Sequence, residues 1–171
     1  MHHDCRMSLA MEFRPSLEGI EATRRFVSDV AVEHLRDGDW TSRVGLVAQE
    51  LLENVLKYSI DGAAALTIDV VPEDDDALIS VRVCSRGQGD HLTALRRLVR
   101  EIAEAADPMA YYVAVMRKTA RETDGSGLGL ARIRAEAEMS LSAKIEGDRV
   151  CVSAQARAAG LGKAVRERAR A

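Results

Sequence analysis

No run of apolar residues in this sequence of 171 residues is long enough to span a membrane, and its start lacks the apolar core of a secretion signal. Internal repeats and low-complexity linkers are also absent. The net charge of −3 gives no general attraction to nucleic acid or to acidic membranes. These absences indicate a cytoplasmic protein that binds neither nucleic acid nor membrane directly.

Cysteine is scarce, and the three residues, Cys5, Cys84 and Cys151, lie far apart in the chain. Because Cys84 and Cys151 fall within strand-like runs, the pattern favours reduced, buried thiols. The cysteines show no metal-ligand spacing, and the four histidines do not cluster with them. No metal site built from Cys and His is therefore indicated.

The composition that remains is globular, with 47% hydrophobic and 30% charged residues. At this length we expect one domain with a sizeable core. We place the domain at residues 9–156, after a flexible N-terminus at residues 1–8. A basic tail, either a frayed helix or disordered, is expected at residues 157–171.

Hydrophobic periodicity predicts the order of the elements. Strands are expected at residues 9–14, 65–71, 78–84, 139–145 and 149–155. Helices are expected from the N-cap Ser16 to about residue 35, from about residue 40, at residues 92–102 and 109–122, and after a glycine run to about residue 138. The predicted inner face of the first helix comprises Leu17, Ile20, Val27, Val30, Ala31 and His34. This order predicts an α+β fold, a two-layer α/β sandwich whose mostly antiparallel sheet is covered by helices on one face.

A stripe of polar residues on the second helix is the first candidate for function. Glu50, Asn54 and Lys57 follow i, i+4, i+7 spacing and therefore share one side of the helix, beside an apolar stripe. The Asn54 oxygen suits Mg²⁺ held beside nucleotide phosphates, and Lys57 could offset phosphate charge. Glu50 could take a proton from a hydroxyl that attacks a phosphate. A solvated helix face is the alternative for each residue taken alone.

A glycine-rich run before a predicted helix is the second candidate. The run contains Gly125, Ser126, Gly127, Leu128 and Gly129. Glycine lets a phosphate approach the backbone, and a helix N-terminus offers unpaired N–H groups. No Gly-Lys-Ser/Thr follows, so the run is not a P-loop, and it lacks the third glycine of the dinucleotide fingerprint. Taken alone, a plain loop before a helix would explain it.

The third candidate is the end of the strand expected at residues 78–84. There Ser85 and Arg86 precede Gly87 and Gly89, which form a Gly-x-Gly turn. A simple strand-to-helix turn is the alternative interpretation of this segment.

Together these segments resemble the histidine-kinase-like (GHKL, Bergerat-fold) ATPase superfamily. Residues 50–59 are similar to its N box, residues 125–133 are similar to its G2 box, and the resemblance covers about residues 9–156. It implies a layered sandwich that binds ATP and Mg²⁺ between the N-box helix and a lid. By resemblance, Asn54 would hold Mg²⁺, Lys57 and Tyr58 would lie near the phosphates or the sugar, and the glycine run would cradle the phosphates.

Within the superfamily the sequence is most similar to bacterial anti-sigma-factor serine/threonine protein kinases, which carry Glu at the position of Glu50. The resemblance implies an enzyme that uses ATP, with Glu50 as the catalytic base. The implied partners are a sigma factor and a STAS-domain antagonist whose Ser or Thr is phosphorylated. A homodimer is also consistent with this subgroup.

Two departures from the family pattern leave a second interpretation open. The family's G1 box begins with an Asp that reads the adenine amino group, and Ser85 stands there, with Gly87 and Gly89 following. Losing such a charge-assisted hydrogen bond costs about 1–3 kcal/mol, roughly a ten- to hundredfold loss of affinity. In addition, residues 90–123, at the lid position, are unusually helical. The alternative is a non-catalytic member of the fold that binds a protein partner without using ATP.

Overall fold

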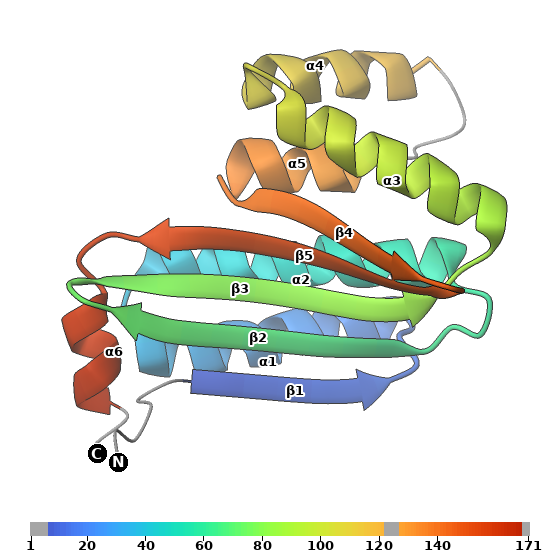
Figure 1. Cartoon of the computed structure of the whole chain (residues 1–171). Coiled ribbons are helices and arrows are strands. Elements are labelled where there is room, and N and C mark those ends of the chain that lie inside the picture. The colour runs from blue at the N-terminus through green and yellow to red at the C-terminus, as the bar shows by residue number, and fades with distance from the viewer. Residues whose placement is uncertain (1–6, 122–126, 169–171) are drawn as a thin grey trace.

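The computed structural model describes residues 7–121 and 127–168. Five strands form one antiparallel sheet in the order β1-β2-β3-β5-β4 (Figure 1). Their bounds are Met7–Phe13 for β1, Ala64–Glu73 for β2, Asp76–Arg86 for β3, Ser140–Glu146 for β4 and Arg149–Ala158 for β5. The sheet therefore has β1 and β4 as its two edge strands, with β3 in the centre.

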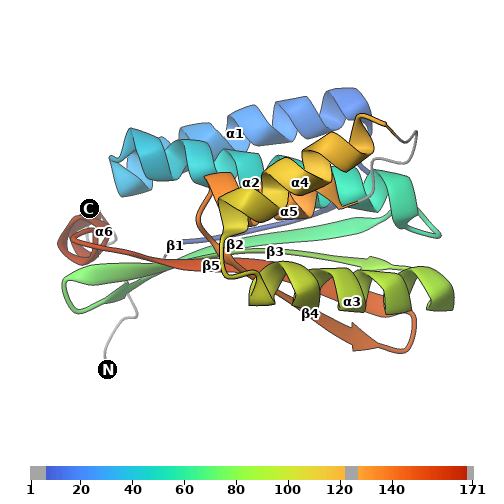
Figure 2. The same cartoon turned by 90° about the horizontal axis from the view of Figure 1, so that it is seen from above.

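Six helices accompany the sheet in the described ranges. They are α1 (Leu17–Leu35), α2 (Gly38–Tyr58), α3 (Gly89–Glu104), α4 (Pro108–Thr119), α5 (Leu128–Glu136) and α6 (Gly162–Arg168). Figure 2 shows α1, α2 and α5 on one face of the sheet. Helix α4 packs on α5, and α3 runs beside β4 at the edge of the sheet (Figures 1 and 2). The predicted fold, a mostly antiparallel sheet covered on one face with helices at the lid position, is confirmed.

Side chains accepting backbone N–H hydrogen bonds start three of the helices. Ser16 Oγ accepts from Gly19 N at 3.0 Å before α1, as predicted, and Asp37 Oδ1 accepts from Trp40 N at 2.9 Å before α2. Asp107 caps α4 in the same way and is followed by Pro108 at the first helical position. These caps satisfy donors that lack a partner within the helix, so local sequence fixes where each helix begins.

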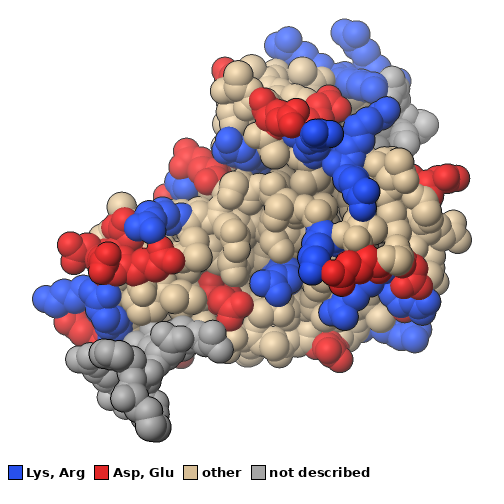
Figure 3. Space-filling view, viewed as in Figure 1, with Lys and Arg blue, Asp and Glu red and all other residues tan. Residues whose placement is uncertain are grey.

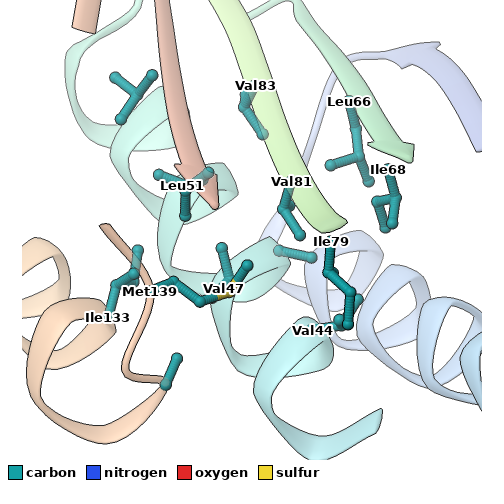
Figure 4. Packing of buried hydrophobic residues seen from close by; sticks show 14 of the residues in the cluster. Val44, Val47, Leu51, Leu66, Ile68, Ile79, Val81, Val83, Ile133 and Met139 are labelled. Atoms are coloured by element: carbon teal, nitrogen blue, oxygen red, sulfur yellow. The ribbon is translucent and has the colours of Figure 1, made fainter. Parts of the chain in front are cut away.

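The core lies between α2 and the covered face of the sheet (Figure 4). Val44, Val47 and Leu51 of α2 are buried and face the sheet. On β3, the alternating residues Ile79, Val81 and Val83 point to the same side, while Arg82 points to solvent. The apolar side chains of α2 and of β3 thus pack together in one layer, and this packing fixes the rotation of α2 about its axis.

Several boundaries differ from those predicted. Strand β1 begins at Met7, two residues before the expected start, and β5 continues to Ala158, beyond the expected start of the tail. Part of that tail forms α6, in which Val165 is buried, and Gly162 N donates to Asp75 O at 2.8 Å. The tail therefore packs against the β2–β3 turn as far as it is described. Leu17, expected on the inner face of α1, is the first residue of the helix and is 74% exposed, and burial begins at Ile20.

The prediction of two reduced, buried thiols was wrong for Cys84 and Cys151. These residues are directly opposite each other in the β3–β5 pairing, with Cα atoms 4.0 Å apart, and they form a disulfide. Both are half-buried and belong to the sheet face that the helices do not cover. The pairing joins residues separated by 67 positions, so it depends on a long-range strand register that sequence pattern does not reveal.

Within the ranges 7–121 and 127–168, no helix combines the length and the apolar character needed to cross a bilayer.

The contrast between the two ends of α1 can be tested by truncating one leucine at each end. Leu35 is 1% exposed, so Leu35→Ala should lower the free energy of unfolding by about 2–5 kcal/mol. Leu17→Ala, the matched control on the same helix, should change it by less than about 0.5 kcal/mol. Urea denaturation followed by circular dichroism measures both values. Equal losses would contradict the packing described for α1.

Candidate functional site

A cavity of about 560 Å³ lies between α2, the ends of β3 and β5, and the two helices α3 and α4. Its floor comes from inward-facing sheet residues such as Val83 and Val152, and its wall comes from α2. Leucines of α3 and Tyr111 of α4 close the opposite side. Among the residues predicted to bind a cofactor, the cavity is lined by Asn54, Tyr58, Ser85, Gly87 and Gly127. The fold thus brings together the three separate segments singled out in the sequence.

Other predicted residues lie outside the cavity wall. Lys57 is exposed on α2, Gly89 opens α3, and Leu128 and Gly129 open α5 without lining the cavity. Gly125 and Ser126 lie outside the described residues. The residues of the polar stripe predicted on α2 therefore have different surroundings: Asn54 lines the cavity, whereas Lys57 is exposed to solvent. The reason is that they lie at different angles from the buried side of the helix.

Asn54 is a residue of α2 that lines the cavity and has a side-chain hydrogen-bond donor without an acceptor. Its Nδ2 atom is buried and has no hydrogen-bond partner. A buried amide without a partner costs free energy, so native structures rarely leave one unless a ligand or water completes it. Asn54 also lines a cavity of ligand size, so its position is a candidate binding site.

Glu50, one turn earlier, turns toward α5 instead of the cavity. Its Oε1 accepts a hydrogen bond from Arg132 Nη1 at 3.1 Å, and its side chain is only 10% exposed. A Cβ at position 129 would approach Glu50 Oε2 to 2.3 Å, so Gly129 leaves room for the carboxylate in this orientation. Burial raises the pKa of Glu50 above its ordinary value, and the hydrogen bond from Arg132 opposes that rise.

Arg132 is a residue that the sequence analysis missed. It also donates to Glu136 at 2.7 Å, one turn along α5, so the guanidinium joins two acids. Tyr112 of α4 lies close to this cluster. Burial is the main cause that raises the pKa of Tyr112, and the negative charges of Glu136 and Glu50 raise it further. A charged residue three positions after Gly129 carries no motif of its own, so only the packing of α5 on α2 reveals it.

Arg86 had no role that could be derived from the sequence, and the structure supplies one. Its guanidinium donates to Asp148 in the β4–β5 turn and lies 3.6 Å from Asp61 after α2. The backbone adds Gly87 N to Asp148 O at 2.8 Å. Three loops are thereby held together beside Ser85, which lines the cavity.

The glycines of the expected nucleotide loops are in contact with leucines of α3. A Cβ at Gly87 would approach Leu92 Cδ2 to 2.7 Å, and one at Gly127 would approach Leu98 Cδ2 to 3.0 Å. Gly127 also has a φ of +89°, which glycine adopts without strain. Helix α3 thus acts as a folded cap over both turns. In addition, the rings of Tyr58 of α2 and His91 of α3 make a tilted contact, with centroids 5.8 Å apart.

No protein-family model matches this chain, and no curated protein matches its sequence. Among solved structures, a similar chain occurs in the crystal structure of the SiaB-SiaC complex from Pseudomonas aeruginosa. The two chains are 21% identical with a TM-score of 0.58, and the match covers 87% of this chain and 89% of that chain. At this identity the likeness shows that the two chains share a fold over most of their lengths.

The environment of Glu50 predicts a pH dependence of stability with a definite sign. The pKa of Glu50 is raised above 4.5 in the folded protein. Between its pKa in the unfolded state and its higher pKa in the folded state, the folded protein therefore binds more protons than the unfolded chain. The parent therefore loses stability as pH rises through that window. Glu50→Gln does not titrate, so its free energy of unfolding relative to the parent should rise with pH and then level off. Urea denaturation over a pH series measures the difference.

Asp61 provides the opposite control. Hydrogen bonds from Ala63 N and Ser59 Oγ lower its pKa below 3.8, so the parent gains stability as pH rises through that range. Asp61→Asn should therefore lose stability relative to the parent as pH rises. A pH-independent difference for Glu50→Gln would contradict the burial of its carboxylate.

Proposed function

We propose that this protein is an ATP-binding regulatory protein of the anti-sigma-factor serine/threonine kinase type. The observation that carries the proposal is the buried amide of Asn54, which has no partner and faces a cavity of about 560 Å³. The N-box resemblance, with Glu50 one turn before Asn54, supports the same assignment. A cavity of this volume is within the range of small-molecule sites.

The donor set around Asn54 fits a magnesium nucleotide better than a metal ion alone. In the described ranges no group of three or more His, Cys, Asp or Glu could hold a metal. Mg²⁺ commonly takes one or two protein oxygens and completes its shell with phosphates and waters. Asn54 would supply the protein oxygen, and an amide turned about its last torsion presents either its oxygen or its nitrogen. Bound Mg-ATP would supply the phosphoryl group.

The residues of this chain would have separate roles in phosphotransfer. Glu50 would accept the proton of a Ser or Thr hydroxyl on the protein substrate, and a raised pKa brings a carboxylate closer to the operating pH of a base. The Arg132 hydrogen bond holds the carboxylate toward α5, so Glu50 must turn by rotation of its side chain to face the cavity. Exposed Lys57 would approach phosphate only from outside the cavity wall.

The expected partner is a protein. The structurally similar chain comes from a complex of two proteins, SiaB and SiaC, which supports binding to a protein partner here. The subgroup resemblance specifies a STAS-domain antagonist as the phosphorylated substrate, with a sigma factor or similar protein as the regulated partner.

A second candidate function is a non-catalytic regulator that binds a partner without using ATP. Two observations favour it. Ser85 offers the cavity a hydroxyl instead of a carboxylate, and leucines of α3 contact both Gly87 and Gly127, where a nucleotide would approach. Nucleotide binding separates the two candidates.

Nucleotide binding should stabilise the folded protein if the first candidate is right. A ligand that binds only the folded state adds about 2.7 kcal/mol to the free energy of unfolding at a hundredfold excess over Kd. Asn54→Ala should remove the Mg²⁺-dependent part of this gain, whereas Gln49→Ala, on the same helix outside the cavity, should keep it. Ser85→Asp should tighten adenine binding roughly ten- to hundredfold. No stabilisation at millimolar ATP or ADP would sink the proposal.

Phosphotransfer should depend on Glu50 specifically. With labelled ATP and a STAS-domain substrate, Glu50→Gln should keep the nucleotide-induced stabilisation and lower the phosphotransfer rate by about 10²–10⁴-fold. Glu53→Gln, which changes a neighbouring acid hydrogen-bonded to Gln49, should retain the rate. Unchanged transfer in Glu50→Gln would remove its assignment as base. Nucleotide binding without any transfer would remove the kinase activity from the proposal and leave the nucleotide-binding role.

A further inference from the structure

Helix α4 carries an apolar stripe on the side opposite the residues that line the cavity. Met109, Val113, Met116 and Ala120 follow i, i+4, i+7, i+11 spacing and share one side of the helix. Met109 is 49% exposed and Met116 41%, and both belong to the small set of large apolar side chains exposed in the described structure. The opposite side of α4 packs against the core through Tyr111, Tyr112 and Val115. Helix α4 is therefore apolar on two sides, of which one is covered.

Basic side chains follow this stripe. The segment of residues 108–121 contains Arg117, Lys118 and Arg121 and has no Asp or Glu, although the whole chain carries a net charge of −3. Together with Ala114 these three residues line a hollow of about 390 Å³ beside α4. Within residues 7–121 and 127–168 none of the three forms an ion pair. Figure 3 shows basic side chains gathered at the end of the molecule formed by α3 and α4.

We infer that this face of α4 is the docking surface for an acidic, amphipathic helix of the protein partner. Methionine side chains adapt to the apolar side of such a helix, and Arg117 and Arg121 would pair with its acids. Charge complementarity selects this occupant, because an acidic partner is repelled by the net negative remainder of the chain and steered toward α4. The inference rests on the proposed regulatory role and names the surface that serves it.

Other occupants fit the same face less well. Nucleic acid would use the cations and leave the methionines in water. A single acidic helix can contact α4 alone, whereas an extended anionic membrane would also bring negative charge close to the acidic remainder of the chain. Because Tyr111 and Val115 of α4 line the cavity, a partner on this face would contact one of the helices that enclose it. The position connects partner binding with access to the cavity.

The test selects peptide ligands for the intact protein from a phage library of random peptides of about 16 residues, roughly four helical turns. Enriched peptides should combine acidic residues with an apolar stripe at helical spacing. A labelled enriched peptide should then bind the parent and lose affinity at least about tenfold in Met109→Ser/Met116→Ser and in Arg117→Glu/Arg121→Glu. The matched control, Arg24→Glu/Arg25→Glu, reverses two exposed cations on α1 and should retain the affinity within about twofold.

Four binding results would overturn the inference. These are no enrichment, enriched peptides without acidic residues, unchanged affinity in both α4 variants, and binding to phosphatidylcholine–phosphatidylglycerol vesicles that depends on Arg117 and Arg121. Conversion of a dimer to a monomer by Met109→Ser/Met116→Ser would assign the face to a second copy and overturn it as well. The substituted residues do not line the cavity, so nucleotide-induced stabilisation should persist in each variant. If the parent protein binds no enriched peptide but is stabilised by nucleotide, only the docking surface is rejected. If the parent binds the peptide but is not stabilised by nucleotide, only nucleotide binding is rejected.

Discussion

The rotation of α2 on the sheet is the constraint on which the site depends. Burial of Val47 and Leu51 against β3 fixes this rotation, and it therefore also determines the direction in which every other side chain of α2 points. Asn54 lies about 60° from Leu51 around the helix and about 40° from Tyr58, so it reaches the cavity. Lys57 lies about 100° from Tyr58 on the outer side and is exposed. A difference of one or two helix positions thus separates a cavity residue from a surface residue.

Local features of the structure could be predicted from the sequence because they arise from local interactions. The alternation in β2 and β3, the caps at Ser16 and Asp37, and the apolar stripe of α2 each depend on residues close together in the chain. The order of the elements and the one-sided covering of the sheet followed from these signals.

Features that depend on long-range contacts could not be predicted in this way. The Cys84–Cys151 pairing needs the register of β3 on β5, and the Glu50–Arg132 contact needs the placement of α5 against α2. The exposure of Leu17 also depends on where α1 first meets the sheet, which periodicity within one helix does not specify. The candidate site could therefore be located by its motifs, while the direction of Glu50 and the role of Arg86 required the fold.

The glycines of the motif segments have structural reasons that are independent of a ligand. Gly129 makes room for the Glu50 carboxylate, Gly87 for Leu92, and Gly127 for Leu98 together with its own left-handed backbone. A glycine-rich turn can thus be maintained by packing alone. Asn54 is different, because its buried amide contributes nothing to the packing that an apolar residue would not contribute better. That contrast makes one amide more informative about ligand binding than three glycines.

The course of α3 beside β4 has a consequence for assembly. It leaves β1 as the strand of the described sheet with an uncovered edge, since β1 pairs only with β2 among the strands described. A sheet with one uncovered edge could pair through that edge with one other sheet. No third sheet could then be added, because the outer edges of such a pair would both be covered. Helix α3, which caps the cavity, thereby also prevents continued edge-to-edge pairing of sheets into fibres.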